Sequence, residues 1–246
     1  MKDKGFNRLS FQIGDIDTSV YNDIDSYIEM LEGVARLTNQ NISLIDFHKE
    51  EILYISDNSL FLYGHSPEEI KQMGSEFNYK FVPEKDRNMI IEVVLAWTKF
   101  LDHKPIEERK EYSLYFDYHL NTTLIKVCMT PLFLCNKGKL WMVVCISKIS
   151  THSEMGNAVI FKINSLNTWH YSFSSHKWFE KKQKLLNETE QQILRLATLG
   201  QKENEICKTI QRSKDALKSI KRKMYQKIEV DNMTEAVSFA ITHGMI

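Results

Sequence analysis

The positive charge of this sequence is concentrated in one segment. Between Lys181 and Lys227 there are 13 lysines and arginines and only 5 acidic residues, whereas the whole chain has 32 of each kind. Such a segment can bind a polyanion, because lysine and arginine neutralise phosphates and supply the salt-dependent share of nucleic-acid affinity. The rest of the chain is correspondingly acidic, which excludes a protein that is basic throughout.

Several of these basic residues repeat at helical spacing. Lys214, Lys218, Lys221 and Arg222 recur at intervals of three and four, which places them on one side of a helix. The apolar residues of the same stretch define the other side, and they are Ala216, Leu217, Ile220, Met224 and Ile228. A basic stripe is most often only a solvated face, so the stripe alone does not select nucleic acid.

The cysteines and histidines give weaker evidence for a catalytic or metal-binding site than the basic residues give for polyanion binding. The four cysteines show no CxxC spacing or adjacent histidine, and we interpret them as buried apolar residues. An enzymatic hypothesis would use Cys128 or Cys145 as a nucleophile beside His119, but both cysteines lie in strand-like apolar runs and a nucleophile needs an accessible thiolate. We therefore expect no catalytic activity, no metal and no cofactor.

The basic stripe must be positioned by its neighbours, and local signals predict four short helices there. Asn187 and Asn232 are each followed three residues later by glutamate, Ser213 can cap a third helix, and Gly200 can end the first. The predicted helices span 187–200, 203–210, 213–228 and 232–244. The tight link between the second and third, with a basic face on the third, is the layout of a helix-turn-helix DNA binder.

Residues 186–246 resemble the LuxR-type (GerE-like) helix-turn-helix family along their whole length. The matching stretches are Leu186-Asn187-x-x-Glu190, Ile193-Leu194-x-Leu196-Ala197, Gly200, Glu205-Ile206, Ser213, Leu217-Lys218, Lys227-Ile228-x-Val230, Glu235-Ala236-Val237 and Gly244-Met245-Ile246. The resemblance implies that the third helix enters the major groove. It also implies DNA-contacting residues, with Lys218, Ser219 and Arg222 facing bases or phosphates and Lys214, Lys221 and Lys223 contacting the backbone.

Three positions depart from the family pattern. Lys202 replaces a common serine near the second helix, and we include it among the DNA-binding candidates. Ala216 replaces the usual threonine and Ile220 the usual histidine, which removes two polar groups. The operator preference of relatives therefore does not carry over to this chain.

The acidic part of the chain predicts a sheet with helices. An amphipathic helix at 22–40 precedes strand-like runs at 42–47 and 52–56, and three longer runs follow at 111–120, 123–134 and 140–150. Between these groups, Ser66-Pro67-Glu68-Glu69 is a capping box, and a longer helix opens at Val82-Pro83 and ends before Pro105. We expect a five-stranded antiparallel sheet with helices on one face.

This order resembles a PAS sensor domain. Leu62-Tyr63-Gly64-His65-Ser66-Pro67-Glu68-Glu69-Ile70 is similar to the family's "GYSPEEI" segment, with His65 in place of the usual tyrosine, and Val82-Pro83-Glu84-Lys85-Asp86-Arg87 is similar to its "HPDDR" segment. The resemblance implies an apolar interior. We favour a packed core or an unknown small-molecule ligand there over a known cofactor.

The predicted fold class is α+β, with four parts. They are an N-terminal helical segment (1–40), a PAS-like sensor domain (41–150), a β-hairpin connector (151–180) and a LuxR-type four-helix domain (181–246).

The sequence predicts a DNA-binding transcriptional regulator. Its expected partners are double-stranded DNA and a second copy, the homodimer forming through the fourth helix of the DNA-binding domain or the N-terminal helix. The longest apolar run, Leu140 to Ile146, is too short to span a bilayer, and the N-terminus has no signal-peptide pattern, so we expect no membrane association and a cytoplasmic location. The alternative is a PAS-mediated protein-interaction adaptor whose basic segment docks an acidic protein.

Overall fold

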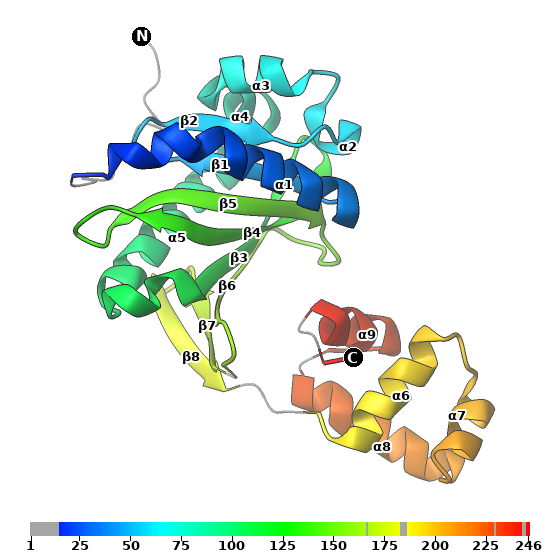
Figure 1. The fold of residues 1–246 in the computed structure, drawn as a ribbon. Helices are drawn as coiled ribbons and strands as arrows, with labels where there is room; N and C mark the ends of the chain where they lie inside the picture. Colours follow the sequence, from blue (N-terminus) through cyan, green and yellow to red (C-terminus); the bar gives the residue numbers. More distant parts are fainter. Residues whose placement is uncertain (1–14, 166, 183–185, 229, 243–244) are drawn as a thin grey trace. The chain divides into compact units, whose positions relative to one another are not determined.

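The computed structural model of the chain describes residues 15–165, 167–182, 186–228, 230–242 and 245–246. The chain divides into two compact units, Met1–Lys181 and Lys182–Ile246. Figure 1 shows a sheet with helices in the first and a group of short helices in the second. The predicted α+β fold class and the all-helical second part are confirmed, whereas the predicted five-stranded sheet is wrong.

The first unit is built on one sheet, which has eight strands within the described residues. Their order across the sheet is β2-β1-β5-β4-β3-β6-β7-β8. The strands are β1 (Asn41–Asp46), β2 (Glu51–Ile55), β3 (Tyr112–Leu120), β4 (Thr123–Leu134), β5 (Leu140–Ile149), β6 (Gly156–Lys162), β7 (Asn167–Ser172) and β8 (Lys177–Lys182).

The three additional strands come from the segment predicted as a hairpin connector. In a five-stranded sheet β3 would be an edge, with a row of unpaired backbone N–H and C=O groups. Instead β6 pairs with β3, opposing Leu114 with Ile160, and both side chains are fully buried. β7 then pairs with β6, and β8 follows as the outermost strand. The segment is thus part of the sheet.

Helices cover both faces of this sheet. The 3-10 helix η2 (Thr18–Asp23) and α1 (Ile24–Thr38) lie over β1 and β5, where Leu31 and Ala35 pack with Leu44. Because side chains alternate along a strand, Ile45 next to Leu44 faces the other helical layer. The expectation of helices on one face alone is therefore wrong, since it left the amphipathic N-terminal helix without a packing surface.

The second helical layer is formed by the part of the chain that connects β2 to β3. It consists of α2 (Ser59–Leu62), α3 (Pro67–Met73), α4 (Ser75–Phe81), α5 (Glu84–Asp102) and the 3-10 helix η3 (Ile106–Glu111). The predicted capping box opens α3, where the Ser66 hydroxyl accepts from the Glu69 N–H at 3.2 Å and the Glu69 carboxylate accepts from the Ser66 N–H at 2.7 Å. In α5, apolar residues at spacings of three and four include the fully buried Val93 and Trp97.

The second unit contains four helices among its described residues. They are α6 (Glu188–Thr198), α7 (Glu203–Thr209), α8 (Lys214–Ile228) and α9 (Met233–Thr242). The Asn187 side chain accepts from the Glu190 N–H at 2.9 Å, the Ser213 hydroxyl from the Ala216 N–H at 3.2 Å and Asn232 from the Glu235 N–H at 2.9 Å. Each predicted cap therefore starts its helix, while Gly244, the predicted end of the fourth, lies outside the described residues.

Candidate functional site

The basic helix of the second unit, α8, has one buried side and one charged side. Leu217, Met224 and Ile228 are buried against the other helices of this unit. Ile220, which replaces the family's histidine, also packs against the buried cluster of Ile193, Ile206, Cys207 and Leu217. The polar contact that this position lacks is thus exchanged for an apolar one that holds α8 in place.

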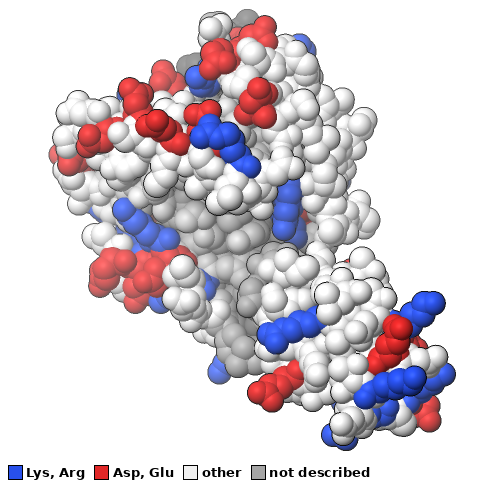
Figure 2. Space-filling view, turned by 45° about the vertical axis from the view of Figure 1, so that its right-hand side comes forward, with Lys and Arg blue, Asp and Glu red and all other residues white. Residues whose placement is uncertain are grey.

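The opposite side of α8 carries exposed cations. Lys214, Lys218, Arg222 and Lys223 are exposed and Ser219 is half-buried. In the part of the chain that the structure describes, no ion pair engages any of these four cations. Figure 2 shows blue side chains gathered on the helical unit, with a few red ones beside them. These charges remain available to an external polyanion.

Lys221 is placed differently from its neighbours on α8. Its ammonium lies 2.5 Å from the carboxylate of Glu203 in the first turn of α7, and its side chain is only 21% exposed. The pKa of the Glu203 carboxyl is held below its ordinary value, first by the hydrogen bond and charge of Lys221 and then by Lys214 and Lys218. The pair ties together the two helices of the helix-turn-helix, so a phosphate would compete with Glu203 for Lys221.

A second ion pair, which the sequence analysis missed, joins α8 to α6. The Lys227 ammonium lies 2.6 Å from the Glu190 carboxylate, whose side chain is 7% exposed. Glu190 also accepts from the backbone N–H of Asn187 at 2.8 Å. The buried carboxylate of Glu190 therefore caps α6 and also holds α8 against α6. Only the capping role can be recognised from the neighbouring residues in the sequence.

Lys202 stands at the start of α7, with an exposed side chain. Its backbone N–H donates to the Glu205 carboxylate at 2.7 Å. The ammonium group has no acceptor with which to return a capping bond, unlike the serine common at this position in the family. Its side chain is therefore free of the capping role and adds positive charge before α7.

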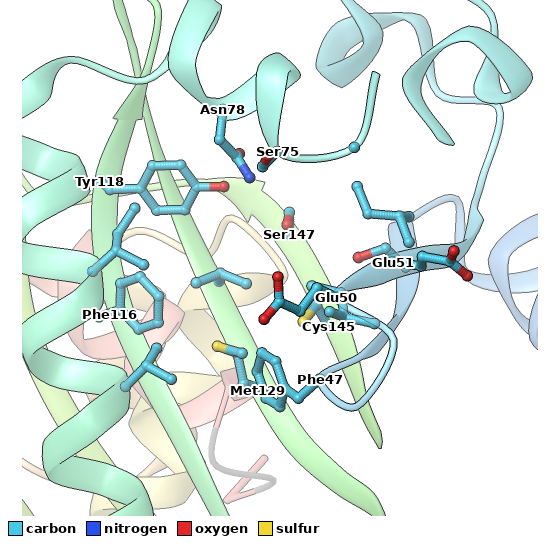
Figure 3. Close-up of a pocket in the computed structure, with 17 residues that line it drawn as sticks. Phe47, Glu50, Glu51, Ser75, Asn78, Phe116, Tyr118, Met129, Cys145 and Ser147 are labelled. Carbon is cyan, nitrogen blue, oxygen red and sulfur yellow. The ribbon is translucent and has the colours of Figure 1, made fainter. Parts of the chain in front are cut away.

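The first unit contains a cavity of about 170 Å³ between the sheet and helices α4 and α5 (Figure 3). Its lining comes from seven elements and the turns beside them, β1, β2, α4, α5, β3, β4 and β5. The apolar part is formed by Phe47, Ile90, Val94, Phe116, Val127 and Met129. A concave apolar space with polar groups at its rim is the general form of a small-molecule site.

Polar side chains face this cavity from several elements. Figure 3 shows the Tyr118 hydroxyl pointing into it, with Ser75 and Asn78 above and Ser147 on the sheet side. Burial raises the pKa of Tyr118, so its hydroxyl stays neutral. Glu50, in the turn between β1 and β2, directs its carboxylate toward the same space.

The opposite side of α5 contacts β7 and β8, the last two strands of the sheet. Glu92 accepts from the Tyr171 hydroxyl at 2.9 Å and contacts the His176 ring at 2.7 Å. The Trp178 ring N–H donates to the Ala96 carbonyl at 3.2 Å. α5 therefore lines the cavity on one side and supports β7 and β8 on the other.

The cysteines and histidines do not form the nucleophile that the enzymatic hypothesis required. Burial raises the pKa of Cys128, and it raises that of Cys145 to about 12, so both thiols stay protonated near neutral pH. His119 contacts the buried Asp86 carboxylate at 2.9 Å. Among the described residues there is no group of three or more histidine, cysteine, aspartate or glutamate residues able to hold a metal ion. None of the described helices has the length and apolar composition needed to cross a bilayer.

Comparison with known proteins identifies the helical unit. Residues 184–240 match the family model described as "Bacterial regulatory proteins, luxR family". The resemblance inferred from the sequence is confirmed for this stretch, which therefore contains a LuxR-type helix-turn-helix. No curated protein matches the chain.

Several of the solved structures that are similar to the chain are structures of VqmA. The phage VqmA–DPO complex is 12% identical with a TM-score of 0.35, covering 92% of this chain and 91% of that one. The Vibrio cholera VqmA–ligand–DNA complex is 12% identical with a TM-score of 0.25, covering 83% and 82%. The Vibrio cholerae VqmA dimer in the absence of target DNA is 14% identical with a TM-score of 0.24, covering 83% of each chain.

Proposed function

We infer that the chain is a DNA-binding transcriptional regulator whose first unit controls the LuxR-type domain of residues 184–240. The observation that carries this function is the two-sided α8. Its apolar side is buried, while Lys218, Arg222 and Lys223 stay exposed and free of ion pairs with described residues. Such a helix can enter a groove lined by phosphates. Catalysis of a reaction is not part of this function.

On DNA, α8 would lie in the major groove. Lys218, Ser219 and Arg222 are proposed to face bases or phosphates, and Arg222 has the planar fork that fits the two acceptors of guanine. Lys214, Lys221 and Lys223 are proposed to contact the sugar-phosphate backbone, as is Lys202 at the start of α7. Backbone contacts supply affinity and orientation, while groove contacts select the sequence.

The first unit is proposed to sense a small molecule in its cavity. Ile90 and Val94 of α5 line that cavity, and Glu92 and Ala96 of the same helix hold β7 and β8. β8 ends at Lys182, where the second unit begins in the chain. A ligand that shifts α5 would therefore alter the support of the strand that leads to the DNA-binding domain.

A homodimer on two half-sites is the proposed assembly, because one small helix-turn-helix contacts only a few base pairs. The apolar residues Met30, Val34 and Leu37 are exposed on α1, as is Ile241 on α9. These two helices are the proposed interfaces. Since its proposed partner is DNA, we place the regulator in the cytoplasm of a bacterial cell.

Selection of genomic DNA fragments by the purified chain tests this function. We expect enrichment of a defined sequence, protected in a footprint and bound far more tightly than unrelated duplex at the same salt concentration. Binding that is indifferent to base sequence would refute the regulator and favour the adaptor with a basic docking segment.

A further inference from the structure

We propose that the cavity of the first unit binds a small amine or protonated nitrogen heterocycle, with its apolar part against Phe116 and Met129 and its nitrogen beside Glu50. The inference concerns the ligand class, and it rests on the proposed sensor function of this cavity. Three features of the lining support it, namely its charge, its size and its unpaired polar groups.

The charge of the lining favours a cation. Two carboxylates, Glu50 and Glu51, are among the lining residues, and no lysine, arginine or histidine accompanies them. In Figure 3 the Glu50 carboxylate points into the cavity, whereas that of Glu51 points away. The adjacent Lys49 does not neutralise Glu50, because its ammonium lies 3.7 Å from the centre of the Tyr21 ring, which packs with the α1 layer on the other face of the sheet. An anionic ligand would meet uncompensated negative charge here.

The size of the cavity matches a ligand of about one ring. The volume is about 170 Å³, close to that of an engineered cavity of about 150 Å³ that accepts benzene. Phe116, Val127 and Met129 on the sheet side and Ile90 and Val94 on α5 supply the apolar contacts. A six-membered ring with a short side arm matches this volume.

Polar groups around the cavity that lack a partner in the protein can bind the polar end of the ligand. The Tyr118 hydroxyl and the side chains of Asn78 and Ser147 converge on the cavity and make no side-chain hydrogen bond with any residue that the structure describes. None of these polar atoms is sealed from solvent, so a bound ligand would replace water at them. Together with Glu50 they can surround a protonated nitrogen and accept its hydrogen bonds. An apolar ligand would leave these polar side chains without hydrogen-bond partners.

The test is titration calorimetry of the full chain with matched probes. The amines are 2-phenylethylamine, cyclohexylamine and histamine, 3-phenylpropanoate reverses the charge and 2-phenylethanol removes it. We expect at least one amine to bind and 3-phenylpropanoate not to bind. Glu50→Gln should weaken the bound amine by about tenfold or more, because a charge-assisted hydrogen bond becomes a neutral one. It should leave the affinity for 2-phenylethanol unchanged.

Glu51→Gln is the matched control, because it removes the same charge from the next residue, whose carboxylate points out of the cavity. It should change the amine affinity by less than about threefold. Glu50 is exposed, so neither variant should alter the thermal unfolding curve. Equal binding of amine and 3-phenylpropanoate, an unchanged amine affinity in Glu50→Gln, or no binding by any of the amines would overturn the proposal.

Binding of the selected DNA sequence, measured on the same samples by fluorescence anisotropy, separates the two proposals. If the chain binds the amine but no specific DNA sequence, the proposed ligand class is supported and the proposed regulator function is refuted. If the chain binds a specific DNA sequence but none of the amines, the regulator function is supported and the ligand class is refuted.

Discussion

The two units of this protein hold their functional residues in opposite ways. In the second, the proposed contacts are mostly charged side chains on the outside of one helix, between Lys214 and Lys223. In the first, the proposed site is an interior space whose lining extends from Ser43 to Ser147 and comes from seven elements. A surface site needs only a correctly oriented helix, whereas the cavity needs five strands, β1 to β5, and the helices α4 and α5 to be correctly placed.

The largest expected effect tests whether the units are independent in folding. Leu194 is fully buried in the core of the second unit, and Leu194→Ala should cost about 2–5 kcal/mol of the unfolding free energy. We expect calorimetry to show the transition of the second unit at a lower temperature and that of the first unchanged. Leu199→Ala, at a position 75% exposed, is the control and should have little effect. A joint shift of both transitions would contradict the comparison.

The next effect concerns how the surface site selects DNA. Lys218→Ala should weaken specific binding by about 1–3 kcal/mol if Lys218 reads a base, whereas Lys223→Ala should lower the salt dependence with a similar loss on every sequence. Both effects are measured by titrating salt against binding to the selected sequence and to a scrambled duplex. A footprint unchanged by both substitutions would reject α8 as the recognition helix.

A smaller effect probes the interior of the first unit through pH. Burial raises the pKa of Cys145 to about 12 from an ordinary value of 9.0. Above pH 9 the unfolded chain therefore releases a proton that the folded chain retains, so stability falls as pH rises through this range. We expect a loss of at most about 1.4 kcal/mol per pH unit between pH 9 and 12.

Urea unfolding at pH 8, 9 and 10 measures this slope, and Cys145→Ala removes the contribution of the thiol. The variant should lose stability less steeply than the parent over that range, whatever its stability at pH 8. Parallel curves for the two proteins would show that this thiol ionises as easily in the folded chain as in the unfolded one.

The smallest expected effect concerns the carboxylate among the cations of the DNA-binding unit. Glu203→Gln removes the partner of Lys221 and a negative charge beside Lys214 and Lys218. We expect affinity for any duplex to rise about two- to fivefold, with a steeper salt dependence, because one more lysine becomes available to phosphates. Glu188→Gln, which changes an exposed glutamate at the start of α6, is the control. A weaker affinity in Glu203→Gln would mean that the ion pair is needed to orient α7 on α8.

The comparison also explains which parts of the fold could be predicted. Asn187, Ser213 and Asn232 cap helices with residues only three positions away, so the sequence contains the whole signal. The pairs Lys221–Glu203 and Lys227–Glu190 join residues 18 and 37 positions apart, and no local pattern indicates them. The pairing of β6 with β3 was missed for the same reason, since it depends on where a sheet edge lies in space.

The cavity illustrates the same limit in the first unit. The individual strands and α5 were predicted from their apolar spacing, but spacing does not reveal that Tyr118, Asn78 and Ser147 face one space. Of the proposed DNA contacts, Lys218 is exposed, whereas Lys221 is engaged by a partner that only the tertiary structure supplies.

The outermost strand β8 has a consequence for how the protein behaves at high concentration. Its sequence is KWFEKK, and all of its residues except Trp178 are exposed. A flat apolar strand in this position would invite amyloid-like stacking of one molecule on the next, and charged side chains oppose such stacking. We therefore expect the charged residues of β8, Lys177, Glu180 and Lys182, to oppose aggregation of the protein when it is expressed in quantity.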